Sequence, residues 1–282
     1  MFQDFAAQVR ADFARARFKA FINRVQNILR RQPHTLLSYD DVKEKLRIGG
    51  PIYRGIKTVE VSKIVGSLNR YHQFDRAFLP LNSQTANRWQ NVDRAFYQEI
   101  DLPPVVLYKV GDVYFVVDGH HRVSVAREQG QLFIEADVRE CSTKVNITPD
   151  LKPEDLEILG EKVNFLERTN LDRIRPRASI KLTIPDGFDR MLEHIAVHRY
   201  FMGLDLQRDI PEEEAVAHWY DTVYRPIVHT IRRSSVLKGF PGKTEGDLYL
   251  WILDRQAYLN QQGNDLLPPD QAARDFIDET DK

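Results

Sequence analysis

The sequence has little cysteine, little net charge and no long apolar run. Its 282 residues include one cysteine, Cys141, which excludes an internal disulfide and suits a reducing compartment. The formal net charge of −1 argues against a strong overall basic field for nucleic acid. No apolar run reaches the ~18 residues of a membrane span, and the acidic Asp4 and Asp12 do not fit a signal peptide. We therefore expect a cytoplasmic protein without a membrane partner.

The composition is that of a folded protein, with 42% hydrophobic and 29% charged residues. The length allows one large domain or two modest ones. Changes of pattern along the chain predict three parts: an N-terminal helical arm over residues 1–50, a central domain over 51–148 and a mostly helical domain over 149–282. The first part is basic, with ten Lys or Arg against five Asp or Glu.

The N-terminal arm is predicted to contain a long amphipathic helix over residues 2–31, which Pro33 ends. Its apolar residues recur near helical spacing: Phe2, Phe5, Val9, Phe13, Phe21, Val25 and Ile28. One interpretation is a docking helix that packs on the rest of the protein or on a second copy, which would make a homo-oligomer. The other is a basic helix, residues 10–31, that contacts DNA phosphates or a membrane surface. Ser38 then caps a short helix that ends near Leu46.

The central part alternates between strand and helix patterns. We expect a strand over 58–66, a polar segment over 69–76 and a helix over 85–99. A β-hairpin follows, with strands 105–110 and 113–117 around Gly111-Asp112. A helix from His120 to Gln129 and a strand over 134–140 complete a compact α+β unit.

The C-terminal part carries mainly helical patterns. Helices are predicted over 154–167 and 188–202, after Pro211, and over 247–259, with Pro226 kinking or dividing the third of them. One strand is predicted over 177–184. His194 and His198 have a metal-compatible spacing, but no third ligand is evident. Gly242-Lys243-Thr244 imitates the end of a phosphate loop, yet Leu237 stands where that motif needs glycine.

The clearest functional signal is Asp118-Gly119-His120-His121-Arg122, between the hairpin and the following helix. A glycine turn that leads into a helix N-terminus is a common phosphate site, because free backbone N–H groups and the helix dipole both favour an anion. Arg122 and the histidines add side-chain donors at the same place. The alternative is a structural turn whose histidines cap the helix.

This motif, with Val116-Val117 before it and Ala126 after it, resembles the nucleotide-phosphate motif of the ParB/sulfiredoxin superfamily. The resemblance covers about 85 residues and implies a mixed-sheet α+β domain that binds the phosphates of ATP, ADP or CTP with Mg²⁺. It assigns nucleotide binding to Gly119 and Arg122, and it matches His121 to sulfiredoxins and free-serine kinases. It matches Asp118 to the aspartate of the kinases.

The chain also departs from these families. Sulfiredoxins carry a catalytic cysteine where His120 stands, so repair of sulfinic acid is not expected. ParB proteins follow the motif with a helix-turn-helix DNA reader, which is not recognisable in residues 151–282. The kinases need a carboxylate base in the early polar segment, for which Asp75 is the nearest candidate.

The sequence therefore predicts a nucleotide-dependent NTPase or small-molecule kinase. Its nucleotide site would combine Gly119, His120, His121 and Arg122 with three residues of the polar segment, Asn69, Arg70 and Arg76. Asp118 would hold Mg²⁺ or orient the nucleophile, with His121 and Asp75 as further catalytic candidates. Two alternatives remain: a nucleotide-gated DNA-associated regulator without turnover, and a degenerate domain kept as a scaffold. For Asn69, Arg70 and Arg76, the equal alternative is that they are ordinary surface-loop residues without a role in binding.

Overall fold

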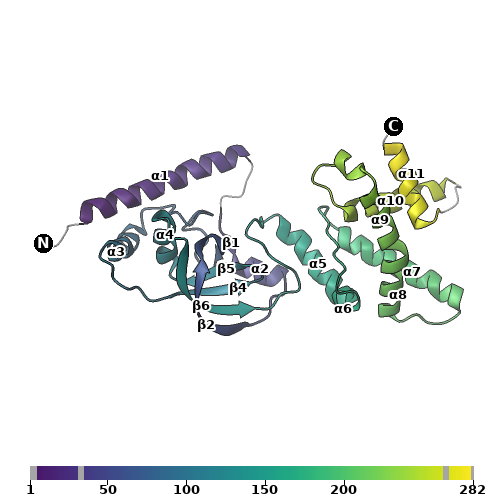
Figure 1. Cartoon of the computed structure of the whole chain (residues 1–282), viewed down its shortest axis with the longest axis horizontal. Coiled ribbons are helices and arrows are strands. Elements are labelled where there is room, and N and C mark those ends of the chain that lie inside the picture. Colours follow the sequence, from purple (N-terminus) through teal and green to yellow (C-terminus); the bar gives the residue numbers. More distant parts are fainter. Residues whose placement is uncertain (1–4, 31–34, 263–266, 281–282) are drawn as a thin grey trace. The chain divides into compact units, whose positions relative to one another are not determined.

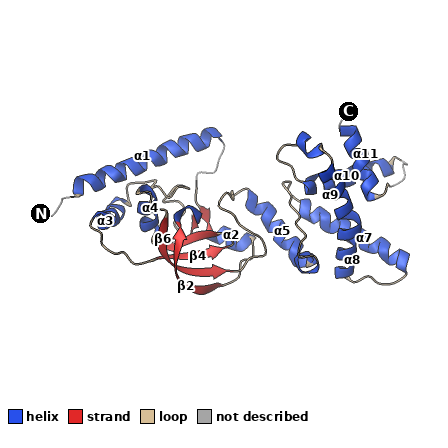
Figure 2. Ribbon diagram, in the orientation of Figure 1, coloured by secondary structure: helices blue, strands red, loops and turns tan. Residues whose placement is uncertain are grey.

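The computed structural model describes residues 5–30, 35–262 and 267–280. The chain forms two compact units, Met1–Leu156 and Glu157–Lys282 (Figure 1). Unit 1 contains a six-stranded mixed sheet with helices, whereas the described part of unit 2 contains helices and no strand (Figure 2). The predicted α+β class is confirmed. Within the described ranges, no helix combines the length and the apolar character that crossing a membrane requires.

The sheet of unit 1 has the strand order β1-β3-β5-β4-β6-β2. The predicted hairpin is present as β4 (Val105–Val110) and β5 (Val113–Asp118), which pair antiparallel. On one side, β5 pairs parallel with β3 (Ile64–Ser67), which pairs parallel with the short β1 (Leu37–Ser38). On the other side, β4 pairs parallel with β6 (Phe133–Cys141), and β2 (Pro51–Glu60) is the outer strand. The sheet thereby places the end of β5 near its centre.

The single strand predicted over 58–66 is wrong. The structure divides this stretch into β2, a 3₁₀ turn at Val61–Lys63, and β3. The two strands lie in opposite halves of the sheet, β2 at one edge and β3 next to the strand at the other edge, so the chain leaves the sheet between them. Arg127 stabilises the crossing, because its Nη2 donates to the carbonyl oxygens of Val61 at 2.9 Å and Ile64 at 2.6 Å. Periodicity alone does not reveal such a crossing.

Helices cover both faces of the sheet. On one face, α4 (His120–Glu128) packs Val123 into a core with sheet residues that include Leu107 and Val116, and α3 (Ala86–Tyr97) adds Trp89 over α4. On the other face, α2 (Tyr39–Lys45) places Tyr39 against Tyr108 and Phe115. Ser38 caps α2 as predicted, accepting a hydrogen bond from the Asp41 N–H. Helix α3 thus lies beside α4, the helix that begins directly after β5.

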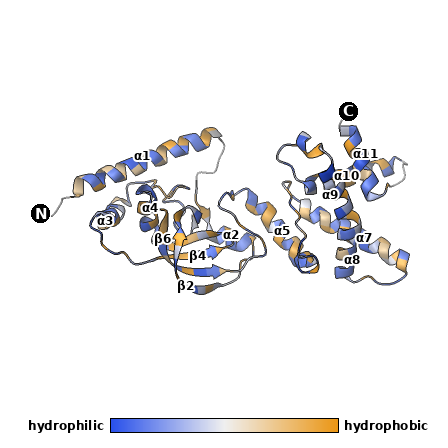
Figure 3. Ribbon diagram, in the orientation of Figure 1, coloured by the Kyte–Doolittle hydropathy of each residue, from blue (hydrophilic) through white to orange (hydrophobic). Residues whose placement is uncertain are grey.

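Helix α1 (Ala6–Arg30) packs on α3 and α4 through the residues up to Ala20. Its buried side chains include Val9, Phe13, Ala16 and Ala20. Glu128 of α4, whose side chain is 1% exposed, accepts ion pairs from Arg15 and Lys19, both at 2.9 Å. Apolar side chains of the second half stay exposed: Phe18, Phe21, Val25, Ile28 and Leu29. Figure 3 shows this mixture of polar and apolar residues along α1.

Unit 2 consists of helices α5 (Asp155–Thr169), α6 (Leu171–Ile174), α7 (Gly187–Leu206), α8 (Glu212–Trp219), α9 (Arg225–Arg233), α10 (Glu245–Gln261) and α11 (Pro269–Thr280). A 3₁₀ turn at Val236–Gly239 joins α9 to α10. A π-helical turn, Tyr220–Tyr224, joins α8 to α9. Pro226 explains this turn, because proline has no N–H and its ring crowds the carbonyl four residues earlier.

The strand predicted over 177–184 is wrong. This stretch is irregular and bonds to the start of α10 instead of to another strand. The buried Asp247 carboxylate accepts from the N–H and the hydroxyl of Thr183, each at 2.8 Å. Thr244 donates its hydroxyl to the Lys181 carbonyl at 2.6 Å. Side chains of the α10 capping box therefore satisfy backbone groups that a sheet would otherwise pair.

Candidate functional site

Gly119 is the residue at which β5 turns into α4. Its φ of +94° lies in the left-handed region, and it occupies the N-cap position of the helix. A Cβ at this position would lie 2.6 Å from Val105 Cγ1 and 3.0 Å from the Nε and Nη2 atoms of Arg122. Glycine has no side chain to cap the helix, so first-turn N–H groups stay available for an anion. The positive φ and the close packing of Val105 and Arg122 therefore explain why glycine occupies this turn.

His120 is the first residue of α4 and is 4% exposed. Its Nε2 lies 2.7 Å from the Ser67 hydroxyl, and its ring also makes a backbone hydrogen bond to Val116. Burial, with a smaller effect of Arg70 and His121, lowers the pKa of His120 to about 4. A neutral ring held on both sides serves mainly to position the start of α4 against the sheet.

His121 has a different environment from His120. Both of its ring nitrogens are shielded from solvent and have no hydrogen-bond partner in the described part of the chain. Its ring meets Phe74 edge-on with a centroid separation of 5.4 Å. Burial, followed by the nearby charges of Arg70 and Arg88, lowers the pKa of His121 to about 4. Unpaired buried ring nitrogens are costly, and a hydrogen-bonding ligand in the adjoining pocket would satisfy them.

Arg122 is held by the loop before β4 and by Asp118. Its Nη2 lies 2.8 Å from Asp118 Oδ2, and its Nη1 donates to the carbonyls of Pro103 and Pro104, the latter at 3.0 Å. The Asp118 side chain is 73% exposed, whereas that of Arg122 is 15% exposed. The Arg122 guanidinium is therefore held in one position, and the Asp118 carboxylate beside it is exposed to solvent.

These residues line a pocket of about 350 Å³ together with Arg70, Arg88, Asn91 and Val92. Arg88, Asn91 and Val92 lie on one face of α3, at spacings of three and four residues. No ion pair joins Arg70 or Arg88 to a carboxylate within the residues that the structure describes. The pocket therefore gathers three arginines and two histidines around the start of α4, with Asp118 as its one carboxylate.

The sequence analysis did not identify Arg88 or Asn91. The helical pattern over 85–99 assigned Trp89 and Val92 to the apolar face, and Arg88 and Asn91 flank that face. Trp89 anchors the helix, since it is buried and its Nε1 donates to the Ser124 hydroxyl of α4 at 2.9 Å. The sequence therefore contained a signal. Arg88 and Asn91 are the polar neighbours of Trp89 and Val92, so they lie at the edge of the surface on which α3 packs.

A second pocket of about 340 Å³ adjoins the first, and Val92 and Arg122 line both. Most of the residues that line it are apolar, among them Phe96, Leu102, Pro103 and Phe133. Two carboxylates, Asp101 and Glu135, also line it. A cationic pocket beside an apolar one suits a ligand with an anionic end and a planar or apolar end.

Three residues of the predicted site lie outside the lining of the cationic pocket. Asn69 is exposed in a turn with φ +65°. Arg76 donates to the carbonyls of Pro149 and Leu151. Asp75 is 4% exposed and accepts the Leu79 N–H at 2.8 Å, and burial raises its pKa. The base role of Asp75 therefore stays a prediction that the pocket lining does not support.

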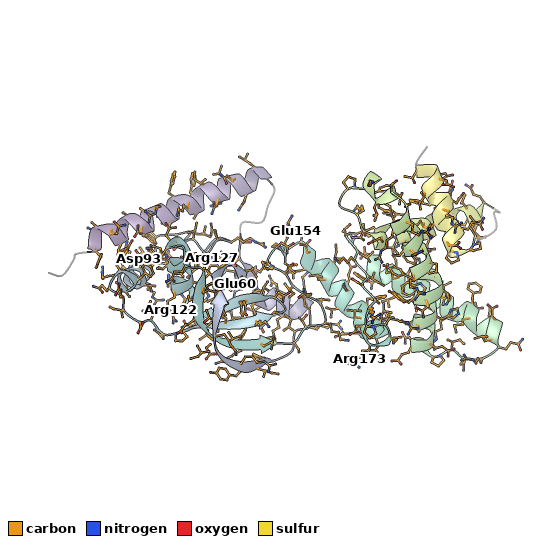
Figure 4. The ribbon with its side chains drawn as sticks, viewed as in Figure 1. Glu60, Asp93, Arg122, Arg127, Glu154 and Arg173 are labelled. Carbon is orange, nitrogen blue, oxygen red and sulfur yellow. The ribbon has the colours of Figure 1, made fainter. Side chains whose placement is uncertain are left out.

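Arg127, the second arginine of α4, contrasts with Arg122. Its guanidinium lies 5.2 Å from the centre of the Phe78 ring and bonds to backbone carbonyls, and burial lowers its pKa to about 10. Figure 4 labels Arg122 and Arg127 toward opposite ends of α4. One arginine thus stabilises the fold, while the other lines the pocket.

The carboxylates at the cationic pocket decide whether it can hold Mg²⁺. No group of three or more His, Cys, Asp or Glu side chains suited to a metal occurs within the described ranges. Mg²⁺ in nucleotide sites is commonly held by one or two carboxylates together with phosphate oxygens and water. The exposed Asp118 carboxylate at the cationic pocket meets that requirement.

Comparison with known proteins adds no assignment: no protein-family model matches the chain, and no curated protein matches it.

Proposed function

We propose that unit 1 binds a nucleoside di- or triphosphate, as the resemblance to the ParB/sulfiredoxin superfamily implies. The observation that carries this proposal is the convergence of Arg70, Arg88 and Arg122 on the N-terminus of α4, where Gly119 leaves the backbone open. Arginine forks and helix N–H groups are typical partners of phosphate oxygens. The unpaired His121 ring supplies one further donor or acceptor.

The adjoining apolar pocket supports a nucleotide over a simple phosphate ester. A base that enters it would lie against Phe96 and Phe133, with its phosphates beside Arg122. Asp101 and Glu135 are hydrogen-bond acceptors, which favours a base with an exocyclic amino group. Adenine and cytosine carry such a group, so ATP, ADP and CTP are the ligands we propose.

The proposed reaction is phosphoryl transfer, either to water or to a small molecule. Arg70, Arg88 and Arg122 would neutralise the charge that spreads over the transferred group, which is the main catalytic requirement of this chemistry. Asp118 would hold Mg²⁺ against the phosphates or orient the nucleophile. We also propose a cytoplasmic location, since a reducing compartment suits the free and buried Cys141.

Nucleotide binding should raise the melting temperature of the full chain. A ligand that binds only the folded state at 100 times its Kd adds about 2.7 kcal/mol of stability. We expect ATP, ADP or CTP with Mg²⁺ to produce this shift, and Arg122→Ala to abolish it. Circular dichroism of the variant without nucleotide provides the folding control. Equal calorimetric affinities of the wild type and the folded variant would contradict the proposal.

A second candidate function is a nucleotide-gated regulator that binds DNA without turnover. The observation that favours it is the outer face of α1, where Arg10, Arg17 and Arg24 are exposed. Binding to duplex DNA that weakens steeply with salt, without phosphate release, would support the regulator. Phosphate release without affinity for DNA would support the enzyme.

His121 should make nucleotide binding dependent on pH. Its pKa of about 4 in the free protein keeps the ring neutral at pH 7. A phosphate anion beside the ring would raise that pKa, so binding takes up a proton and the affinity increases as the pH falls from about 7.5 to 5.5. Calorimetry in buffers of different ionisation enthalpy measures this uptake.

His121→Gln is the control for this dependence, because the protons of the nucleotide itself titrate equally in both proteins. We expect the variant to lose the part of the uptake that belongs to the ring. The same proton uptake in both proteins would show that His121 does not face the anion.

A further inference from the structure

Unit 2 contains a pocket of its own whose wall carries several arginines. It has a volume of about 610 Å³ and is lined by residues of the π-helical turn, of α9 and of the irregular stretch after α6. Arg225, His229 and Arg232 occupy one face of α9, at spacings of four and three residues, and all three are exposed. Arg177 joins them from the irregular stretch.

The charge balance of this pocket is positive. Three arginines line it against one carboxylate, that of Asp221. Asp221 is already paired with Arg175, a contact that lowers its pKa, and it lies 3.6 Å from Arg225 Nη1. Arg232 is paired with Glu245 at 2.9 Å. Arg177 has no ion pair within the described part of the chain, so its guanidinium is available to an anion.

The π-helical turn adds an aromatic wall to the pocket. Tyr220 and Tyr224 stack with ring centres 5.6 Å apart, and both line the cavity. Tyr224 is buried against Trp219 and Tyr249, with ring centres at 5.5 and 5.0 Å. A rigid wall of this kind holds the pocket open and offers a planar surface beside the cations.

We infer that this pocket binds a phosphorylated small molecule. Arginine forks select phosphate oxygens, and the volume lies within the range of small-molecule sites, about 300–1,000 Å³. A duplex would need an extended basic surface that contacts many phosphates, whereas these cations line one concavity. The phosphate group enters between Arg177 and the α9 face, and the tyrosine wall faces the rest of the molecule.

Pyrophosphate is the probe for this site, titrated by calorimetry into the full chain. The background is the Arg70→Gln/Arg88→Gln variant, which removes two of the proposed phosphate contacts of unit 1 and weakens that site. In that background we expect pyrophosphate still to bind, and Arg177→Gln to weaken the binding about tenfold. His229→Gln should weaken it less, since glutamine keeps a side-chain hydrogen-bond donor, whereas Arg177→Gln removes a fixed positive charge.

Arg173→Gln is the matched control, because Arg173 (labelled in Figure 4) is an exposed arginine four residues before Arg177 and is not among the residues that line the pocket. It should leave the affinity unchanged. Absence of pyrophosphate binding in the unit 1 background, or equal effects of Arg173→Gln and Arg177→Gln, would overturn the inference. A 20-base-pair duplex that binds through Arg177 more tightly than pyrophosphate would also overturn it. None of these results depends on whether unit 1 binds nucleotide.

Discussion

Replacement of both Arg70 and Arg88 by glutamine should lower nucleotide affinity about 100-fold or more. Each guanidinium lines the cationic pocket, and each is proposed to make a charge-assisted contact worth about 1.5–3 kcal/mol. Two such contacts correspond to a factor of about 10² to 10⁴ in Kd. Calorimetric titration with ATP or CTP and Mg²⁺ measures the loss.

Folding should be almost unaffected by this double substitution. Arg88 is exposed, and neither arginine pairs with a carboxylate in the part of the chain that the structure describes. Arg17→Gln on α1 is the matched control: it removes an exposed positive charge outside the pocket lining. Affinities that fall equally in the control and in the double variant would indicate a general charge effect and contradict direct contact with phosphate.

Substitution of Gly119 by alanine should destabilise unit 1 by about 2–5 kcal/mol. The φ of +94° costs an alanine about 1–2 kcal/mol, and the approach of its Cβ to Val105 Cγ1 at 2.6 Å adds an overpacking cost of about 1–3 kcal/mol. The added methyl also displaces the Arg122 guanidinium, so nucleotide affinity falls as well. Denaturant unfolding measures the change in free energy.

Gly130→Ala separates the two causes. Gly130 follows α4 with φ +71°, and a Cβ there would have no atom within 4 Å. The control therefore carries the backbone cost alone, and we expect a loss of about 1–2 kcal/mol. If Gly119→Ala costs no more than Gly130→Ala, the close packing around the turn is not what requires glycine there.

Local features of the sequence determined the centre of the site. The apolar strand, the Gly119 turn and the helix that follows were predicted together, because a turn with positive φ and a 3.6-residue apolar period are written in neighbouring residues. The hairpin β4–β5 was predicted for the same reason. The α+β class followed from strands and helices that alternate along the central part, whereas the mixed sheet was an expectation from the family resemblance.

Contacts between distant residues were not predictable in this way. Helix α3 brings Arg88 to the pocket only because Trp89 is buried and bonded to Ser124, 35 residues later. The predicted phosphate contacts divide for a similar reason: Arg70 lines the pocket, whereas Arg76 is directed to the carbonyls near Leu151. An irregular loop has no periodicity from which the directions of two arginine side chains could be predicted.

The sequence by itself determined where we propose that an anion binds, since the backbone geometry at Gly119 and the charge of Arg122 are properties of five consecutive residues. Only the tertiary structure decided which other cations meet there, which histidine stays unpaired and which carboxylate reaches solvent. His120 bonds to Ser67 while its neighbour His121 lacks a partner in the described part of the chain. Burial and pairing depend on the elements packed around a side chain, and that packing is set by residues far away in the chain.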